Sequence, residues 1–157
     1  MFNKFQIDRK YARIGWIMLI PALILGLLHM YSELEPGFLD AKVFALLNDD
    51  LSIFSGKDSK TIGVISNNIF DELLAIFIVV GSLLIVLAKE EVEDEYILQL
   101  RQESMFWALI THSILLLFTI IFVYGMTFLN IMVFNLFMPL LLFIGRFRYV
   151  LYKASKV

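Results

Sequence analysis

Two long apolar runs that flank a short, highly charged segment constrain the fold of this chain more than any other feature. The runs cover residues 69–88 and 105–127, and the charged segment between them covers residues 89–104. A helix needs about 20 mostly apolar residues to cross a bilayer, and each run is that long. The charged segment therefore predicts the polar bend of a helical hairpin that enters a membrane and returns.

The composition excludes a soluble domain of this size. Hydrophobic residues make up 60% and charged residues 18% of the 157 residues, against about 45–50% and about 25% in soluble domains. A small soluble fold has too little interior for so much apolar surface, so the excess must face lipid or protein partners. The net charge of −2 gives no indication of a nucleic-acid partner, and the lack of cysteine excludes disulfides and thiolate metal sites.

We predict one all-α domain, residues 1–157, with four membrane spans. The spans are expected at about 14–31, 69–88, 105–126 and 129–145, with a non-spanning segment at 32–68 and the acidic bend at 89–104. Within 32–68, the choice between strand and short helix stays open for residues 42–47. Small residues in the middle of two spans indicate helix-packing faces, namely Ala22 with Gly26 and Gly81 with Ser82.

The basic residues predict the sidedness of the spans. If both termini share one side, ten of the 13 Lys and Arg residues lie on it, and the other three are Lys42, Lys57 and Lys60. Because Lys and Arg favour the cytoplasmic side, we expect both termini and the acidic bend to be cytoplasmic.

The third helix is predicted to begin near residues 93–95 and to extend into the cytoplasm, because no Gly or Pro interrupts it before Gly125. Val92, Tyr96 and Leu100 form an apolar stripe on its first turns, and this stripe must pack against another surface. The alternatives are the end of the second helix, the C-terminal segment, and another subunit or protein. The resulting candidates for partner docking are Val92, Glu93, Asp94, Tyr96, Leu100 and Arg101.

Polar residues at two helix starts have a local explanation. Asn67 and Asn68 precede Asp71 and Glu72, which is the pattern of an N-cap followed by acidic residues in the first turn. We favour this interpretation over the alternative of a catalytic or ion-binding carboxylate pair at Asp71 and Glu72. Asn130 is interpreted in the same way at the start of the fourth span. His29, near the end of the first span, is interpreted as an interfacial residue in contact with water.

Four polar residues inside the third and fourth spans are candidates for an intramembrane site: Thr111, His112, Thr119 and Asn135. An ionisable residue within a membrane suggests function by default. Pro139 also leaves the carbonyl of Asn135 without its helical partner, which adds a second polar group at that depth. A neutral His112 hydrogen-bonded to Thr111 or Asn135 would serve structure equally well.

The motifs of common enzymes and metal sites are absent. The sequence has no phosphate-binding glycine loop, HExxH motif or nucleophile elbow, and we expect no metal and no cofactor. The five acids of the bend would need further ligands from another segment to hold a divalent cation, and we interpret them as a solvated helix cap.

Four segments together resemble a group of small, uncharacterised four-span membrane proteins of Bacteroidota bacteria. They are residues 10–21, 67–74, 89–104 and 124–130. The resemblance implies a location in the bacterial inner membrane, and it implies no activity and no functional residue.

These observations favour a non-enzymatic membrane module that acts by assembly, either with its own copies or with another membrane protein. The alternative is a small transporter or channel with a polar path near His112 and Asn135. A membrane enzyme ranks third, because no nucleophile–base pair is evident.

Overall fold

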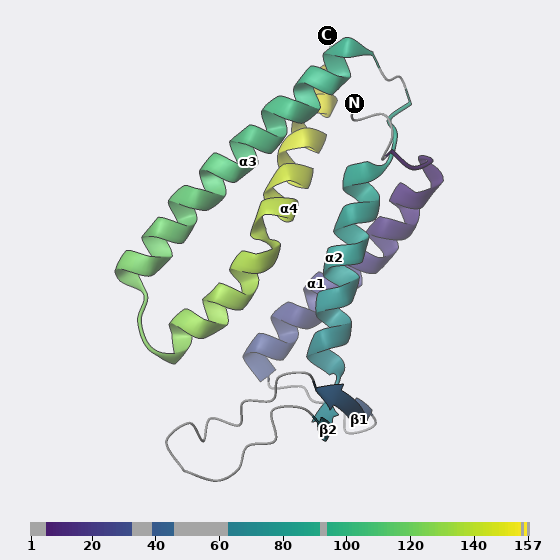
Figure 1. Cartoon of the computed structure of the whole chain (residues 1–157). Coiled ribbons are helices and arrows are strands. Elements are labelled where there is room, and N and C mark those ends of the chain that lie inside the picture. The colour runs from purple at the N-terminus through teal and green to yellow at the C-terminus, as the bar shows by residue number, and fades with distance from the viewer. Residues whose placement is uncertain (1–5, 33–38, 46–62, 92–93, 155, 157) are drawn as a thin grey trace.

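The computed structural model describes residues 6–32, 39–45, 63–91, 94–154 and 156, and Figure 1 draws its helices and strands. Four helices and a small two-stranded sheet make up the described chain. In chain order they are α1 (Lys10–Ser32), β1 (Asp40–Ala45), β2 (Gly63–Asn68), α2 (Phe70–Leu87), α3 (Glu95–Phe122) and α4 (Met126–Ala154).

All four helices are long and apolar enough to cross a membrane, which confirms the predicted four-helix, multi-pass architecture. The shortest, α2, has 18 residues and is about 27 Å long. Two helices extend beyond the predicted spans. The first helix begins at Lys10, before residue 14, and α4 continues past Gly145 to Ala154. Beyond Gly145, α4 is held by side chains such as Phe147 that pack into the core.

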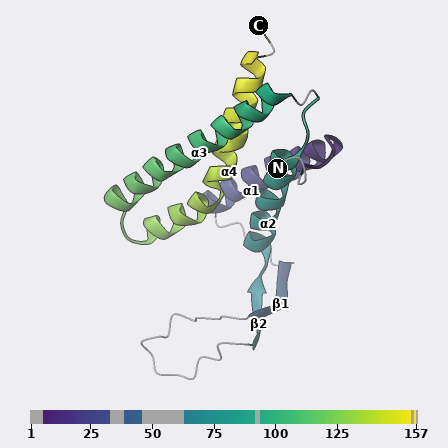
Figure 2. The same ribbon diagram turned by 45° about the horizontal axis from the view of Figure 1, so that its top comes forward.

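The helices form two antiparallel hairpins, α1 with α2 and α3 with α4, and α2 contacts α4 to join them. The start of α1, the end of α2, the start of α3 and the end of α4 lie together, and we call this region the termini end (Figures 1 and 2). The β-hairpin lies at the opposite end, here called the sheet end.

The first hairpin is packed at a contact between two glycines. A Cβ added to Gly15 would lie 2.6 Å from the carbonyl oxygen of Gly81, and one added to Gly81 would lie 3.0 Å from the oxygen of Gly15. Only glycine permits this approach, and Ser82 beside it is fully buried. The predicted packing face at Gly81 and Ser82 is confirmed. In the first span Ala22 is buried, but the space beside Gly26 is open.

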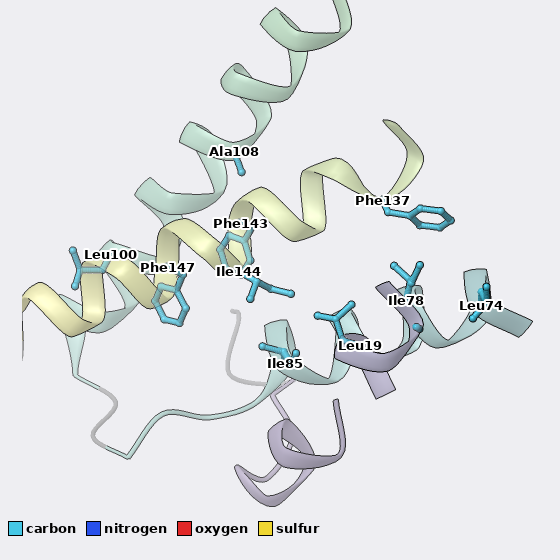
Figure 3. Close-up of a cluster of buried hydrophobic side chains, with 11 residues drawn as sticks. Leu19, Leu74, Ile78, Ile85, Leu100, Ala108, Phe137, Phe143, Ile144 and Phe147 are labelled. Carbon is cyan, nitrogen blue, oxygen red and sulfur yellow. The ribbon is translucent and has the colours of Figure 1, made fainter. Parts of the chain in front are cut away.

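The core lies where α4 meets the first hairpin (Figure 3). Phe143, Ile144 and Phe147 of α4 form one buried cluster with side chains from the other three helices. The remaining labelled members are Leu19 from α1, Leu74, Ile78 and Ile85 from α2, Leu100 and Ala108 from α3, and Phe137 from α4.

The β-hairpin was not part of the all-α prediction. The strands pair antiparallel, with Asp40 opposite Asn68 and Ala45 opposite Gly63. Asn67 and Asn68 therefore belong to β2, and the N-cap of α2 is Ile69, which has no side-chain cap. Asn68 still accepts a hydrogen bond from the amide of Phe70 at 3.0 Å, so it satisfies one free amide of the helix start. Of the two alternatives left open for residues 42–47, the structure shows the strand at residues 42–45, and residues 46–62 lie outside the described residues.

The second hairpin begins at the predicted position, but its fourth helix starts earlier than the interpretation of Asn130 as a cap required. Asp94 caps α3 by accepting a hydrogen bond from the amide of Ile97 at 2.8 Å, and the helix then runs for 28 residues. Gly125 makes the turn with a φ of 71°. Because α4 starts at Met126, Asn130 lies about one turn inside the helix and is not its cap.

Candidate functional site

Among the described residues, no side-chain hydrogen bond joins the four intramembrane candidates to one another. Thr119 and Asn135 are buried, but Thr119 donates to the carbonyl of Leu115 in its own helix at 2.9 Å. A hydroxyl bonded in this way has used its only donor within its own helix, and it can offer a ligand only an acceptor. Thr111 and His112 are half-buried, and in the described part of the chain no hydrogen bond links His112 to Asn135.

Of the candidates for partner docking that the structure describes, Leu100 and Arg101 are buried, and Asp94 and Tyr96 are exposed. Leu100 is 7% exposed and packs in the core cluster with Phe143 and Phe147, so α4 covers this part of the apolar stripe. Asp94 is exposed but serves as the cap of α3, while Tyr96 is 55% exposed. Val92 and Glu93 lie outside the described residues. The C-terminal helix is therefore one partner of the stripe, as one of the predicted alternatives had it.

Arg101 closes the C-terminal end of α2. Its guanidinium is buried and donates to the carbonyls of Val86 at 2.8 Å and Ala88 at 3.2 Å. The same group lies 5.1 Å from the ring centre of Phe147 on α4. The last carbonyls of a helix lack partners within the helix, so this arginine satisfies them and joins three helices. We call these contacts the Arg101 clasp.

The acidic bend is tied into the termini end. Glu90, with a side chain only 13% exposed, pairs with Arg148 of α4 at 3.2 Å, and Glu91 pairs with Arg9 at 2.9 Å. Ile7 also bonds to the backbone after α2, donating to Leu87 and accepting from Lys89. The interpretation as a solvated cap is wrong for Glu90. The described residues hold no group of three or more side chains that could bind a metal ion.

A cavity of about 330 Å³ lies at the sheet end between α1, α2 and α4. Its rim is polar, formed by His29, Asp71 and Asn130. The rest of the lining is apolar or glycine, and comprises Gly26, Leu74, Ala75, Ile78, Val133, Phe134 and Phe137. None of the four intramembrane candidates lines it.

The rim is organised by a contact between His29 and Asp71, whose Nε2 and Oδ1 atoms lie 3.0 Å apart. His29 sits in the last turn of α1 and Asp71 in the first turn of α2, so the antiparallel hairpin brings them together. The His29 ring also packs edge-on against Phe70, with centroids 5.6 Å apart. The side chain of Asp71 is 66% exposed and therefore meets solvent.

The described residues around this rim carry more negative than positive charge. Asp40, Asp71 and Glu72 are countered by a single lysine, Lys42. Asp40 accepts a hydrogen bond from Asn68 at 2.9 Å, and Glu72 accepts one from Asn67 at 2.8 Å. These two carboxylates are thereby fixed to β2, whereas Asp71 faces the cavity.

A second cavity, of about 420 Å³, lies toward the termini end between α2, α3 and α4. Met105, Leu109 and Pro139 are among its lining residues, and Arg101 and Gln6 are its polar members. Such an apolar lining fits the hydrocarbon interior of a bilayer and offers few groups that could orient a ligand.

Comparison with protein-family models, with curated proteins and with solved structures finds no match for this chain. The function must therefore be argued from the cavity itself.

Proposed function

We propose that this chain is a non-enzymatic integral membrane protein that binds a small, partly apolar molecule in the sheet-end cavity. The observation that carries the proposal is the cavity's construction, with a volume of about 330 Å³, apolar walls and three polar residues at the rim. Ligand sites are typically about 300–1,000 Å³ in volume, mostly apolar, and carry a few polar groups that fix the ligand's orientation.

The lining residues support binding rather than catalysis. His29 and Asp71 resemble part of a catalytic arrangement, but the described residues of the lining include no Ser, Thr, Tyr or Lys that His29 could activate as a nucleophile. An acyl- or group-transfer site needs such a nucleophile beside its base. A small transporter would use the same cavity as its entry site, and its path would then start at Asp71 rather than at His112.

The location and sidedness that accompany this proposal come from the basic residues. We place the protein in a bacterial inner membrane with the termini end in the cytoplasm, because ten of the 13 Lys and Arg residues belong to that side. The cavity then opens on the opposite, outer side. A ligand would reach it from the periplasm or from the outer leaflet.

Filling the cavity tests the proposal. A Cβ at Gly26 would meet no atom of the described residues within 4 Å, so the side chain of Gly26→Leu starts in open space beside the cavity. Gly145→Leu is the matched control, because Gly145 is also a helical glycine with open space and does not line the cavity. Each change also replaces a helical glycine by a better helix former, and this replacement alone stabilises the helix by about 0.8 kcal/mol.

Binding is measured by fluorine NMR of 6,6,6-trifluorohexan-1-ol added to protein in dodecyl maltoside micelles. We expect the wild type and Gly145→Leu to shift the fluorine resonance equally and saturably, beyond the shift caused by micelles alone. Gly26→Leu should give only the micelle shift. If Gly26→Leu shifts the resonance as the wild type does, the cavity is not a binding site and the proposal fails.

Assembly is a second candidate function, favoured by the packing of α3. Of the other helices, α3 contacts chiefly α4. Its far face exposes large side chains, including Phe106, Ile110 and Ile114, with Ser113 among them. This face would meet a second copy of the chain or another membrane protein. Native mass spectrometry from micelles tests it, and a monomer at all protein concentrations would count against self-assembly.

A further inference from the structure

We infer that the ligand of the sheet-end cavity is a cation, specifically an ammonium group carried on an apolar chain, with Asp71 as its counter-ion. This inference rests on the proposed function and adds the chemical class of the ligand. The ammonium would lie at the rim beside Asp71 and Asn130, and the chain would lie against Leu74, Ile78 and Phe137.

The sign of the charge follows from the rim. Among the described residues that line the cavity, Asp71 is the one carboxylate and His29 the one basic residue, and none is Lys or Arg. The two other described carboxylates nearby, Asp40 and Glu72, add to the negative potential. A cavity with apolar walls concentrates such a field, so it attracts cations and repels carboxylate or phosphate head groups.

Asp71 has acceptor capacity left for a ligand. An ionised carboxylate offers about four lone-pair positions on its two oxygens. His29 lies 3.0 Å from Oδ1, and among the described residues no hydrogen bond is made to Oδ2. Asn130 is exposed and adds an amide oxygen at the same rim. An ammonium group has three donors and no acceptor, which matches a rim of oxygen acceptors.

The apolar residues that line the cavity favour a ligand whose ammonium group carries an apolar chain. Leu74, Ile78 and Phe137 are all below 10% exposed, yet each lines the cavity, so a chain placed there would lose its contact with water. Each methylene buried in this way should strengthen binding about fourfold until the cavity is filled. Compact hydrophilic cations such as ammonium itself would therefore bind poorly.

The same chemistry occurs in two sources, a free amphiphilic amine and the ethanolamine head group of a phospholipid. Both carry a primary ammonium group, and the cavity lies where a membrane-spanning helix meets the outer surface. In the phospholipid a phosphodiester links the ammonium to the chain-bearing glycerol, so its phosphate would have to lie outside the negative rim. The shared group is therefore the claim, and competition between the two sources identifies which one enters.

The experiment compares 6,6,6-trifluorohexan-1-aminium with 6,6,6-trifluorohexan-1-ol, two probes with the same chain and different head groups. Fluorine NMR in dodecyl maltoside gives the apparent dissociation constant of each. For the wild type we expect the ammonium to bind about fivefold more tightly than the alcohol, the upper range for an exposed ion pair. Asp71→Asn should remove that preference, while Glu95→Gln, which removes an exposed carboxylate at the termini end, should keep it.

The outcomes separate the inference from the proposed function. Equal binding of the two probes to the wild type, abolished for both by Gly26→Leu, would overturn the ammonium inference and leave the cavity as a ligand site. A preference that persists in Asp71→Asn would also overturn it. If neither probe distinguishes the wild type from Gly26→Leu, both claims fail. Displacement of the bound ammonium probe by phosphatidylethanolamine, but not by phosphatidylglycerol, would support the claim with a lipid as the source, and displacement by neither would support a free amine.

Discussion

Gly15→Ala should destabilise the protein even though alanine is the better helix former. The added Cβ would lie 2.6 Å from the carbonyl oxygen of Gly81, whereas ordinary contact begins at 3.4 Å. The obstacle is backbone, so α1 and α2 must move apart by roughly the difference, and the Cγ1 atom of Ile85 at 2.8 Å must move as well. Overpacking of this kind costs about 1–3 kcal/mol, and the gain from replacing a helical glycine offsets only about 1 kcal/mol of it.

The matched control is Gly145→Ala, where a Cβ meets nothing within 4 Å. It should gain about 1 kcal/mol from helix propensity alone. The two variants should therefore differ by about 1–3 kcal/mol in the free energy of unfolding. The assay is sodium dodecyl sulfate titration of protein in dodecyl maltoside, followed by the fluorescence of the two tryptophans, Trp16 beside the contact in sequence and Trp107 on α3.

The comparison would refute the reasoning if Gly15→Ala proved as stable as Gly145→Ala. In that case the hairpin would tolerate a wider separation at no cost, and the glycine contact would not hold α1 against α2.

Two further outcomes follow from the termini end and from the sidedness. Arg101→Met leaves the carbonyls of Val86 and Ala88 without their charged donor, and it should lower the free energy of unfolding by about 1.5–3 kcal/mol in the same titration. Arg9→Met, at an exposed ion pair, is the control and should change it by less than about 1 kcal/mol. Because the chain has no cysteine, single cysteines report sidedness cleanly: in spheroplasts, Ser66→Cys should react with a membrane-impermeant maleimide and Glu91→Cys should react only after lysis. The reverse pattern would place the cavity on the cytoplasmic side.

The four helices were predictable because long apolar runs have few alternatives in a bilayer. The start of α3 was also predictable, since Asp94 can cap a helix using contacts within one turn. The β-hairpin was not, because its strands are six residues each and their pairing joins segments about 28 residues apart, as in the bond between Asn68 and Asp40. Local patterns do not encode such a pairing.

The candidate site shows the same limit more clearly. His29, Asp71 and Asn130 each had a sufficient local explanation, as an interfacial residue or as part of a helix start. Their meeting at one rim depends on how α1, α2 and α4 pack, which no spacing along the chain reveals. Arg101 was assigned to the surface for a similar reason, because the carbonyls that it satisfies belong to another helix.

The Arg101 clasp has a mechanical consequence for the cavity. Polar links between the two hairpins, including the pair between Glu90 and Arg148, gather at the termini end, while the cavity lies at the sheet end. If one hairpin rotated slightly about these polar links, each of its atoms would move in proportion to its distance from them. In such a rotation the cavity walls at Phe134 and Phe137 would move farther than any residue of the Arg101 clasp. The cavity would therefore widen or narrow while the clasp stayed in place.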